Sequence, residues 1–149
     1  MNNPEFIKQL KLVFVGKPPH GRINASVDDE SAEDTEAFRR RDWRDLNVDV
    51  LEKHQAALFW FTPEAFHFYL PAFLRASVNT ANPNAIYVHT ILQLMTAGFS
   101  DARWRLFSER EIAVLQQWMI WLEEEAGKGN IFQDVVADAA RSLREYGYA

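Results

Sequence analysis

The sequence contains no cysteine, and this absence removes several kinds of chemistry at once. Disulfide bonds, thiolate metal sites and cysteine nucleophiles are all excluded. Glycine is scarce as well, at 6 of 149 residues, and no P-loop, GxGxxG or GxSxG pattern occurs. The chain therefore offers little material for a loop that cradles phosphate groups.

Basic residues are outnumbered, since 16 Lys and Arg stand against 21 Asp and Glu and give a net charge of -5. General binding to nucleic acid needs clustered cations that contact phosphates, so we expect no nucleic-acid partner. No apolar run approaches the roughly 18 residues of a membrane helix, and the first residues lack the pattern of a signal peptide. We expect a soluble, cytoplasmic protein that does not associate with membranes.

What the chain does have is apolar material, with 48% hydrophobic and 13% aromatic residues. This is enough to bury a core in one domain over residues 1–149. Apolar residues recur at helical spacing between cap-like residues and Pro or Gly breakers. The sequence predicts an all-α, compact, single-domain helical bundle of about five to seven helices. Two segments differ: residues 17–34 are expected to form a polar, acidic loop, and residues 8–15 fit either a helix or a strand.

The segment FTPEAFHFYLPAFL, residues 61–74, is the densest apolar stretch and carries a proline inside a predicted helix. A helical wheel places Pro71 opposite the face of Phe66, Leu70 and Phe73, so we expect it on the wet side, where the helix is kinked around its core. The alternative is a binding groove at the carbonyl group that the proline leaves free. The candidate binding residues are Trp60, His67, Phe68 and Pro71, because the large rings among them are expected to remain at the surface.

This segment resembles the signature of an uncharacterised bacterial family, which reads approximately LTPEAFRYYLPAFL. The likeness is specific over about fifteen residues and loose over two thirds of the chain, including the Trp43 region and the helix after Ser108. His67 departs from the signature, which has arginine at that place. The resemblance implies a small, mostly helical bacterial protein of no assigned activity.

The four histidines, His20, His54, His67 and His89, do not belong to any known metal-binding or catalytic sequence motif. No HExxH, paired i, i+4 histidines or His–carboxylate cluster at metal spacing occurs, so we expect no metal site, no cofactor and no catalytic residue that the sequence can identify. His54 lies among apolar residues, and we expect it to be a core histidine with a backbone or carboxylate partner.

Two functions remain. The leading hypothesis is a non-enzymatic interaction protein, such as an adaptor or an immunity-type inhibitor, with a protein partner or a second copy of the chain. The alternative is a hydrolase or transferase whose site assembles from scattered His, Asp and Glu residues. A concave pocket with a perturbed His or carboxylate favours the enzyme, whereas a broad apolar patch favours the interaction protein.

Overall fold

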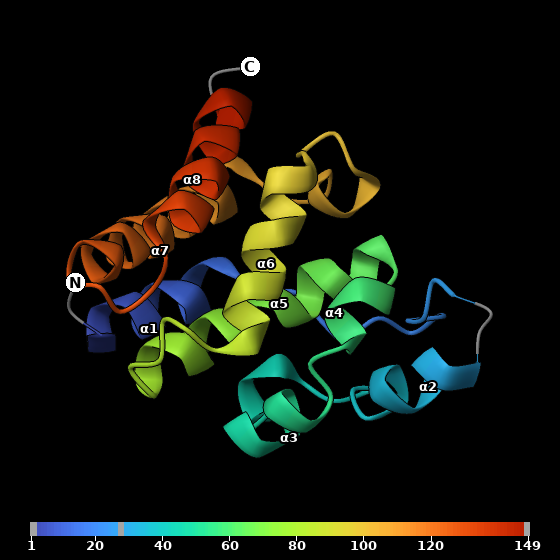
Figure 1. Ribbon diagram of the computed structural model, residues 1–149. Coiled ribbons are helices and arrows are strands. Elements are labelled where there is room, and N and C mark those ends of the chain that lie inside the picture. The colour runs from blue at the N-terminus through green and yellow to red at the C-terminus, as the bar shows by residue number, and fades with distance from the viewer. Residues whose placement is uncertain (1–2, 27–28, 148–149) are drawn as a thin grey trace.

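A computed structural model describes residues 3–26 and 29–147, and these residues are helical throughout apart from turns, loops and one isolated bridge (Figure 1). The predicted all-α class is confirmed. The described residues form α1 (Asn3–Val13), α2 (Asp29–Glu36), α3 (Val48–Lys53), α4 (Ala57–Trp60), α5 (Pro63–Asn79), α6 (Ile86–Ala97), α7 (Glu109–Gly127) and α8 (Gln133–Gly147), with short 3₁₀ helices at η1 (Trp43–Asp45) and η2 (Ala102–Trp104).

The number of α-helices in the described part is therefore eight, above the predicted five to seven. The segment after the cap residue Asn47 contributes two short helices to this number, because α3 ends at Lys53 and α4 begins at Ala57. Residues 8–15 do not form a strand: α1 continues to Val13, and the amide of Phe14 still donates to the carbonyl of Leu10. Val27 and Asp28 of the predicted acidic loop lie outside the described residues, and its last part forms α2.

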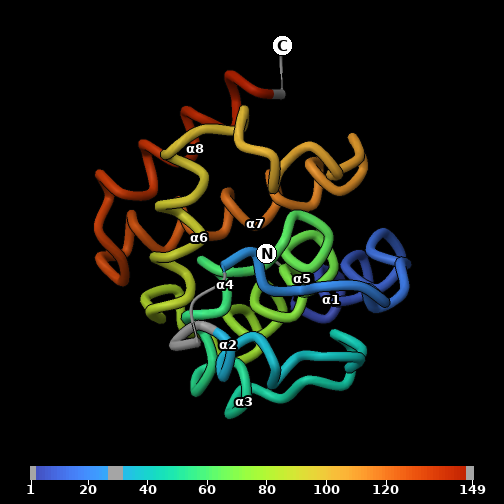
Figure 2. Tube along the Cα trace, turned by 90° about the vertical axis from the view of Figure 1, so that its right-hand side faces the viewer, coloured from blue at the N-terminus to red at the C-terminus, as the bar shows by residue number. Residues whose placement is uncertain are grey.

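Helix α5 is the centre of the fold. It packs against α1, α3, α6 and both 3₁₀ helices, and the ribbon and the tube both show it running through the middle of the molecule (Figures 1 and 2). Thr62 caps its start by accepting a hydrogen bond from the amide of Ala65, and Pro63 occupies the first turn, where the missing N–H has no cost.

The expectation that Pro71 lies on a wet side is wrong. Pro71 is buried, and so are the residues on both sides of it, from Phe68 to Leu74. The helical wheel compared faces within one helix, but α5 has neighbours all round, so its less apolar face is covered as well. The helix nevertheless continues through Pro71 to Asn79.

The C-terminal helices pack as a second group, in which α8 contacts both α6 and α7 (Figure 1). A capping box begins α7, with the side chains of Ser108 and Glu111 each accepting a hydrogen bond from the other's backbone amide. The indole of Trp118 in α7 donates to the Ser77 hydroxyl in α5 at 3.0 Å, and both residues are fully buried. This bond joins the C-terminal group to the central helix. No helix among the described residues is long and apolar enough to cross a bilayer.

The connection between α2 and α3 is anchored by Trp43. Trp43 is fully buried, and the guanidinium groups of Arg44 and Arg75 lie 5.0 and 5.3 Å from its ring centre. His54 meets its predicted carboxylate partner, with Nδ1 3.0 Å from Asp34 Oδ1. Trp43 itself also lines the cavity described below.

Candidate functional site

A cavity of about 660 Å³ lies under the loop from Phe14 to Arg22, and we call it the 14–22 cleft. Its walls combine the loop KPPHGR with residues of α5, with Glu111 of α7, and with the single residues Trp43 and Leu106. A volume of this size is typical of ligand-binding sites.

The loop over the cleft is held at both ends. At one end the carbonyl of Phe14 accepts hydrogen bonds from Trp43 Nε1 at 3.4 Å and Arg44 Nη2 at 2.6 Å. At the other end the chain pairs with the start of α5: the Thr62 amide donates to the Ile23 carbonyl at 2.8 Å, and the Thr62 hydroxyl donates to the Arg22 carbonyl. The loop is thus a fixed wall, tied to the segment that precedes the central helix.

One stripe of α5 faces the cleft, because Glu64, His67 and Phe68 are spaced at i, i+3 and i+4. Phe68 supplies apolar surface and is only 6% exposed. His67 is partly exposed, and its ring meets the edge of Phe107 at a centroid distance of 4.8 Å. The floor of the cleft is therefore aromatic with one imidazole in it.

His67 is held by a carboxylate from another helix. Its Nε2 lies 2.8 Å from Glu111 Oε2, and the other oxygen of Glu111 accepts the backbone amide of Ser108 at 2.7 Å. Burial alone raises the pKa of the Glu111 carboxyl, but the hydrogen bonds from His67 and from the Ser108 amide outweigh it and leave the pKa below its usual value. Glu111 is thus ionised at neutral pH, and the imidazole nitrogen that faces it carries the proton.

The rim of the cleft is mixed in character. Lys17, Arg22 and Glu64 are exposed there and supply charges of both signs. Leu106 also lines the cleft and is 46% exposed, while Val15, between two lining residues, is 69% exposed. At Leu106, apolar surface of the cleft is therefore also accessible from the outside of the protein.

The structure brings together two of the four residues predicted to bind. His67 and Phe68 line the cleft, whereas Trp60 and Pro71 do not. Trp60 is 40% exposed at the end of α4, and Phe68 and Pro71 are buried, so these three do not form the exposed patch that the sequence suggested. Whether any of the four binds a partner stays a prediction.

Sequence reasoning missed Phe14, Trp43, Leu106 and Glu111 as members of this site. The spacing of Ser108 and Glu111 indicates a capping box, and this role alone accounts for a glutamate at position 111, so the sequence gives no sign that Glu111 also lines a cleft. The PPHG turn predicts only that the preceding helix ends, since nothing in the sequence shows which helix a loop will fold over. Within the described residues, no group of three or more His, Asp and Glu side chains could hold a metal ion.

Comparison with known proteins places residues 22–146 in a "Family of unknown function (DUF6714)". The matched region contains α5, His67 and Glu111 but begins at Arg22, after most of the loop that covers the cleft. No curated protein and no solved structure matches the chain.

Proposed function

The chain belongs to the family of unknown function DUF6714, and from its cleft we propose that it is a non-enzymatic interaction protein that binds a partner protein by enclosing an apolar segment of it. The observation that carries the proposal is the aromatic interior of the 14–22 cleft, whose lining includes the exposed Leu106. An adaptor or an immunity-type inhibitor in a bacterial cytoplasm would act in this way.

The surroundings of the cleft favour a protein over a small molecule as its occupant. Leu106 lines the cleft and is nevertheless 46% exposed, so part of its apolar surface lies where a small ligand enclosed in the cleft would not cover it. Around it stand Lys17, Arg22 and Glu64, which supply a polar rim of both signs. An apolar centre with a polar rim is the usual anatomy of a protein interface.

The proposal is tested by photo-crosslinking in the protein's own host cells. A benzophenone amino acid at Leu106 reports contacts at the cleft, and the same amino acid at Ile120, which is 56% exposed on α7 and does not line the cleft, is the matched control. We expect one defined crosslinked protein with Leu106 and none with Ile120.

Whether binding of the partner depends on the cleft is tested by placing an aspartate at the same two positions. Leu106→Asp should weaken capture of the crosslinked protein by at least tenfold, because it puts an unpaired carboxylate against apolar surface, whereas Ile120→Asp should leave capture unchanged. If both variants bind that partner as the unmodified protein does, the cleft is not the binding surface and the proposal fails.

A second candidate, a hydrolase or transferase, is favoured by the His67–Glu111 pair. Because Glu111 accepts from Nε2, the neutral imidazole has its lone pair on Nδ1, and Nδ1 makes no hydrogen bond within the described part of the chain. A base held by a carboxylate in a cleft is a frequent catalytic arrangement. Hydrolysis of aryl esters or phosphate esters by the wild type that disappears in the His67→Gln variant would favour this candidate. Equal rates of hydrolysis by the wild type and the variant would reject it for those substrates.

A further inference from the structure

A second cavity, about 400 Å³, lies where α1, the start of α3 and the end of α5 meet. Lys11, Arg44 and Arg75 line it, and no acidic residue does, although the protein as a whole carries a net charge of -5. Positive charge is thus concentrated here against the overall balance of the chain.

Arg75 is partly buried in this cavity without a carboxylate partner at ion-pair distance in the described structure. Its guanidinium donates to the backbone carbonyls of Trp43, Arg44 and Leu46 at 3.2, 3.0 and 2.7 Å. Burial lowers the pKa of Arg75, and only more distant carboxylates act against this. A partly buried cation that is held by neutral carbonyls gains from a nearby anion.

The other two cations, Arg44 and Lys11, differ in whether a carboxylate already pairs with them. Arg44 is already paired with Asp42, at 2.9 Å between Nη1 and Oδ1, so it adds no free charge. Lys11 is exposed and, among the described residues, its ammonium group has no ion-pair or hydrogen-bond partner. Lys11 and Arg75 therefore bring to one cavity two positive charges that have no ion-pair partner among the described residues.

Beside the cations, two asparagine side chains near the cavity have N–H groups without a partner in the described structure. At the end of α5 the Ala76 carbonyl accepts both the amide and the hydroxyl of Thr80, at 3.0 and 2.7 Å. Asn47 uses its side-chain oxygen to cap α3 through the amide of Val50, which leaves its NH₂ group available. The side-chain amide of Asn79 makes no hydrogen bond within the described structure. The cavity thus presents unused N–H groups.

We propose that this cavity binds an oxyanion, the phosphate or carboxylate group of a small molecule. Lys11 and Arg75 supply the charge, and the amides of Asn47 and Asn79 supply neutral donors. Charge-assisted hydrogen bonds from several directions are the usual means of holding such groups. This site is separate from the 14–22 cleft, and the proposal does not depend on the function proposed above.

The probe is inorganic phosphate, titrated into the full-length ¹⁵N-labelled protein at constant ionic strength, with acetate and chloride as parallel arms. We expect phosphate to shift the side-chain signals of Asn79 and Arg75 in a saturable way. The acetate arm shows whether a carboxylate suffices, and chloride should produce no saturable shift. Failure of phosphate and acetate alike to shift these signals beyond the effect of chloride overturns the proposal.

Two variants give the same test in terms of affinity. Lys11→Glu reverses the free charge at the cavity, and we expect phosphate to bind at least about tenfold more weakly, which is the effect of losing one hydrogen bond to a charged group. Lys8→Glu makes the identical charge change on the same helix, at an exposed residue that does not line the cavity, and should bind nearly as the wild type does. Equal weakening in both variants means that only the net charge matters, and this also overturns the proposal.

Discussion

His67 and Glu111 are 44 residues apart in the sequence, yet their side chains lie 2.8 Å apart, with the imidazole Nε2 facing the carboxylate Oε2. Their contact joins the central helix to the capping box that begins α7. Glu111 therefore caps the start of α7 and also lines the 14–22 cleft. A substitution at Glu111 is expected to change the stability of the fold, and its effect on stability should be measured before any effect on binding is interpreted.

Glu111→Gln should lower the free energy of unfolding at neutral pH by about 1 kcal/mol, because hydrogen bonds to a charged acceptor are lost. The pKa of Glu111 is lowered in the folded protein from its ordinary value of 4.5, so its contribution is present above that value and is lost as the pH falls through the folded pKa. Urea unfolding should thus show a gap between wild type and variant that is largest above about pH 5.5 and shrinks toward pH 3. Glu109→Gln, the same change at an exposed neighbour in the same turn, is the control and should alter the free energy of unfolding at neutral pH by no more than about 0.5 kcal/mol.

Tyr69 gives a prediction at the opposite end of the pH scale. Its hydroxyl donates to the carbonyls of Phe38 and Arg41, and burial raises the pKa of Tyr69 to about 12. Tyr69→Phe should cost about 1–3 kcal/mol of unfolding free energy at neutral pH, since two carbonyls lose their donor. A raised pKa stabilises the fold while the unfolded phenol is still protonated, so the cost should diminish as the pH rises above about 10.

The measurement for Tyr69 is chemical unfolding from pH 7 to pH 11, with Tyr146→Phe as the control. Tyr146 stacks on Phe99, but its hydroxyl donates to no residue in the described part of the chain. A loss of equal size in both variants would show that the ring environment, and not the pair of carbonyl bonds, accounts for the effect.

Much of the architecture follows from local signals. The caps at Thr62 and Ser108 and the apolar spacing of α5 and α7 are properties of short segments, and they predict helices that the structure confirms. The errors concern relations between segments: Pro71 was expected in water because a helical wheel says nothing about a helix with neighbours all round. The cleft was not predicted for the same reason, since the loop 14–22 and Glu111 meet α5 only through tertiary contacts.

The packing of α5 predicts where a truncation is costly. Phe73 is fully buried and lies against the rings of Phe38 and Tyr87, at centroid distances of 6.0 and 5.6 Å. Phe73→Ala should therefore lower the free energy of unfolding by about 3–5 kcal/mol, through lost burial and the cavity that remains. Phe132→Ala makes the same change at a ring that is 74% exposed and should alter stability by no more than about 0.5 kcal/mol. Similar losses from both, measured by urea unfolding, would contradict this assignment of the core.

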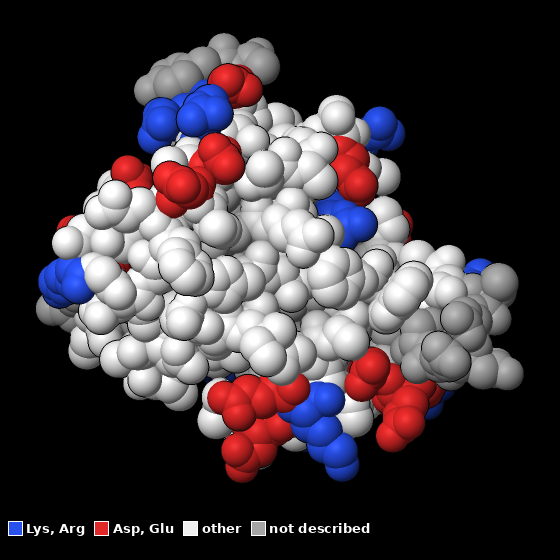
Figure 3. All heavy atoms as spheres, viewed as in Figure 1, with Lys and Arg blue, Asp and Glu red and all other residues white. Residues whose placement is uncertain are grey.

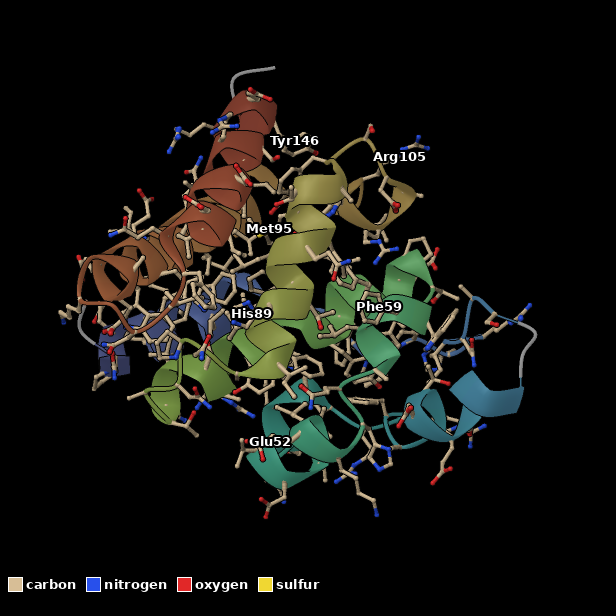
Figure 4. All side chains as sticks on the ribbon, in the orientation of Figure 1. Glu52, Phe59, His89, Met95, Arg105 and Tyr146 are labelled. Carbon is tan, nitrogen blue, oxygen red and sulfur yellow. The ribbon has the colours of Figure 1, made fainter. Side chains whose placement is uncertain are left out.

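The last prediction concerns Trp60, the exposed member of the predicted binding residues. Trp60 and its neighbour Phe59 are 40% and 43% exposed on α4, and Phe59 projects from that helix in Figure 4. In Figure 3, drawn from the same side as Figure 4, the centre of the face that carries Phe59 is largely free of Lys, Arg, Asp and Glu. A surface with few charges and an exposed ring can pack against a second copy with little repulsion between the two chains, each of which has a net charge of -5.

We expect the mean mass from light scattering to rise with concentration toward that of a dimer. Trp60→Ser should abolish the rise, because tryptophan contributes strongly where an interface buries it. Phe132→Ser removes a large exposed ring elsewhere and should leave the rise intact. An acidic residue at Phe68 is a poor probe, since a side chain only 6% exposed cannot become charged without loss of the fold. A wild type that stays monomeric at every concentration, or a Trp60→Ser variant that associates as the wild type does, would show that α4 is not a self-association surface.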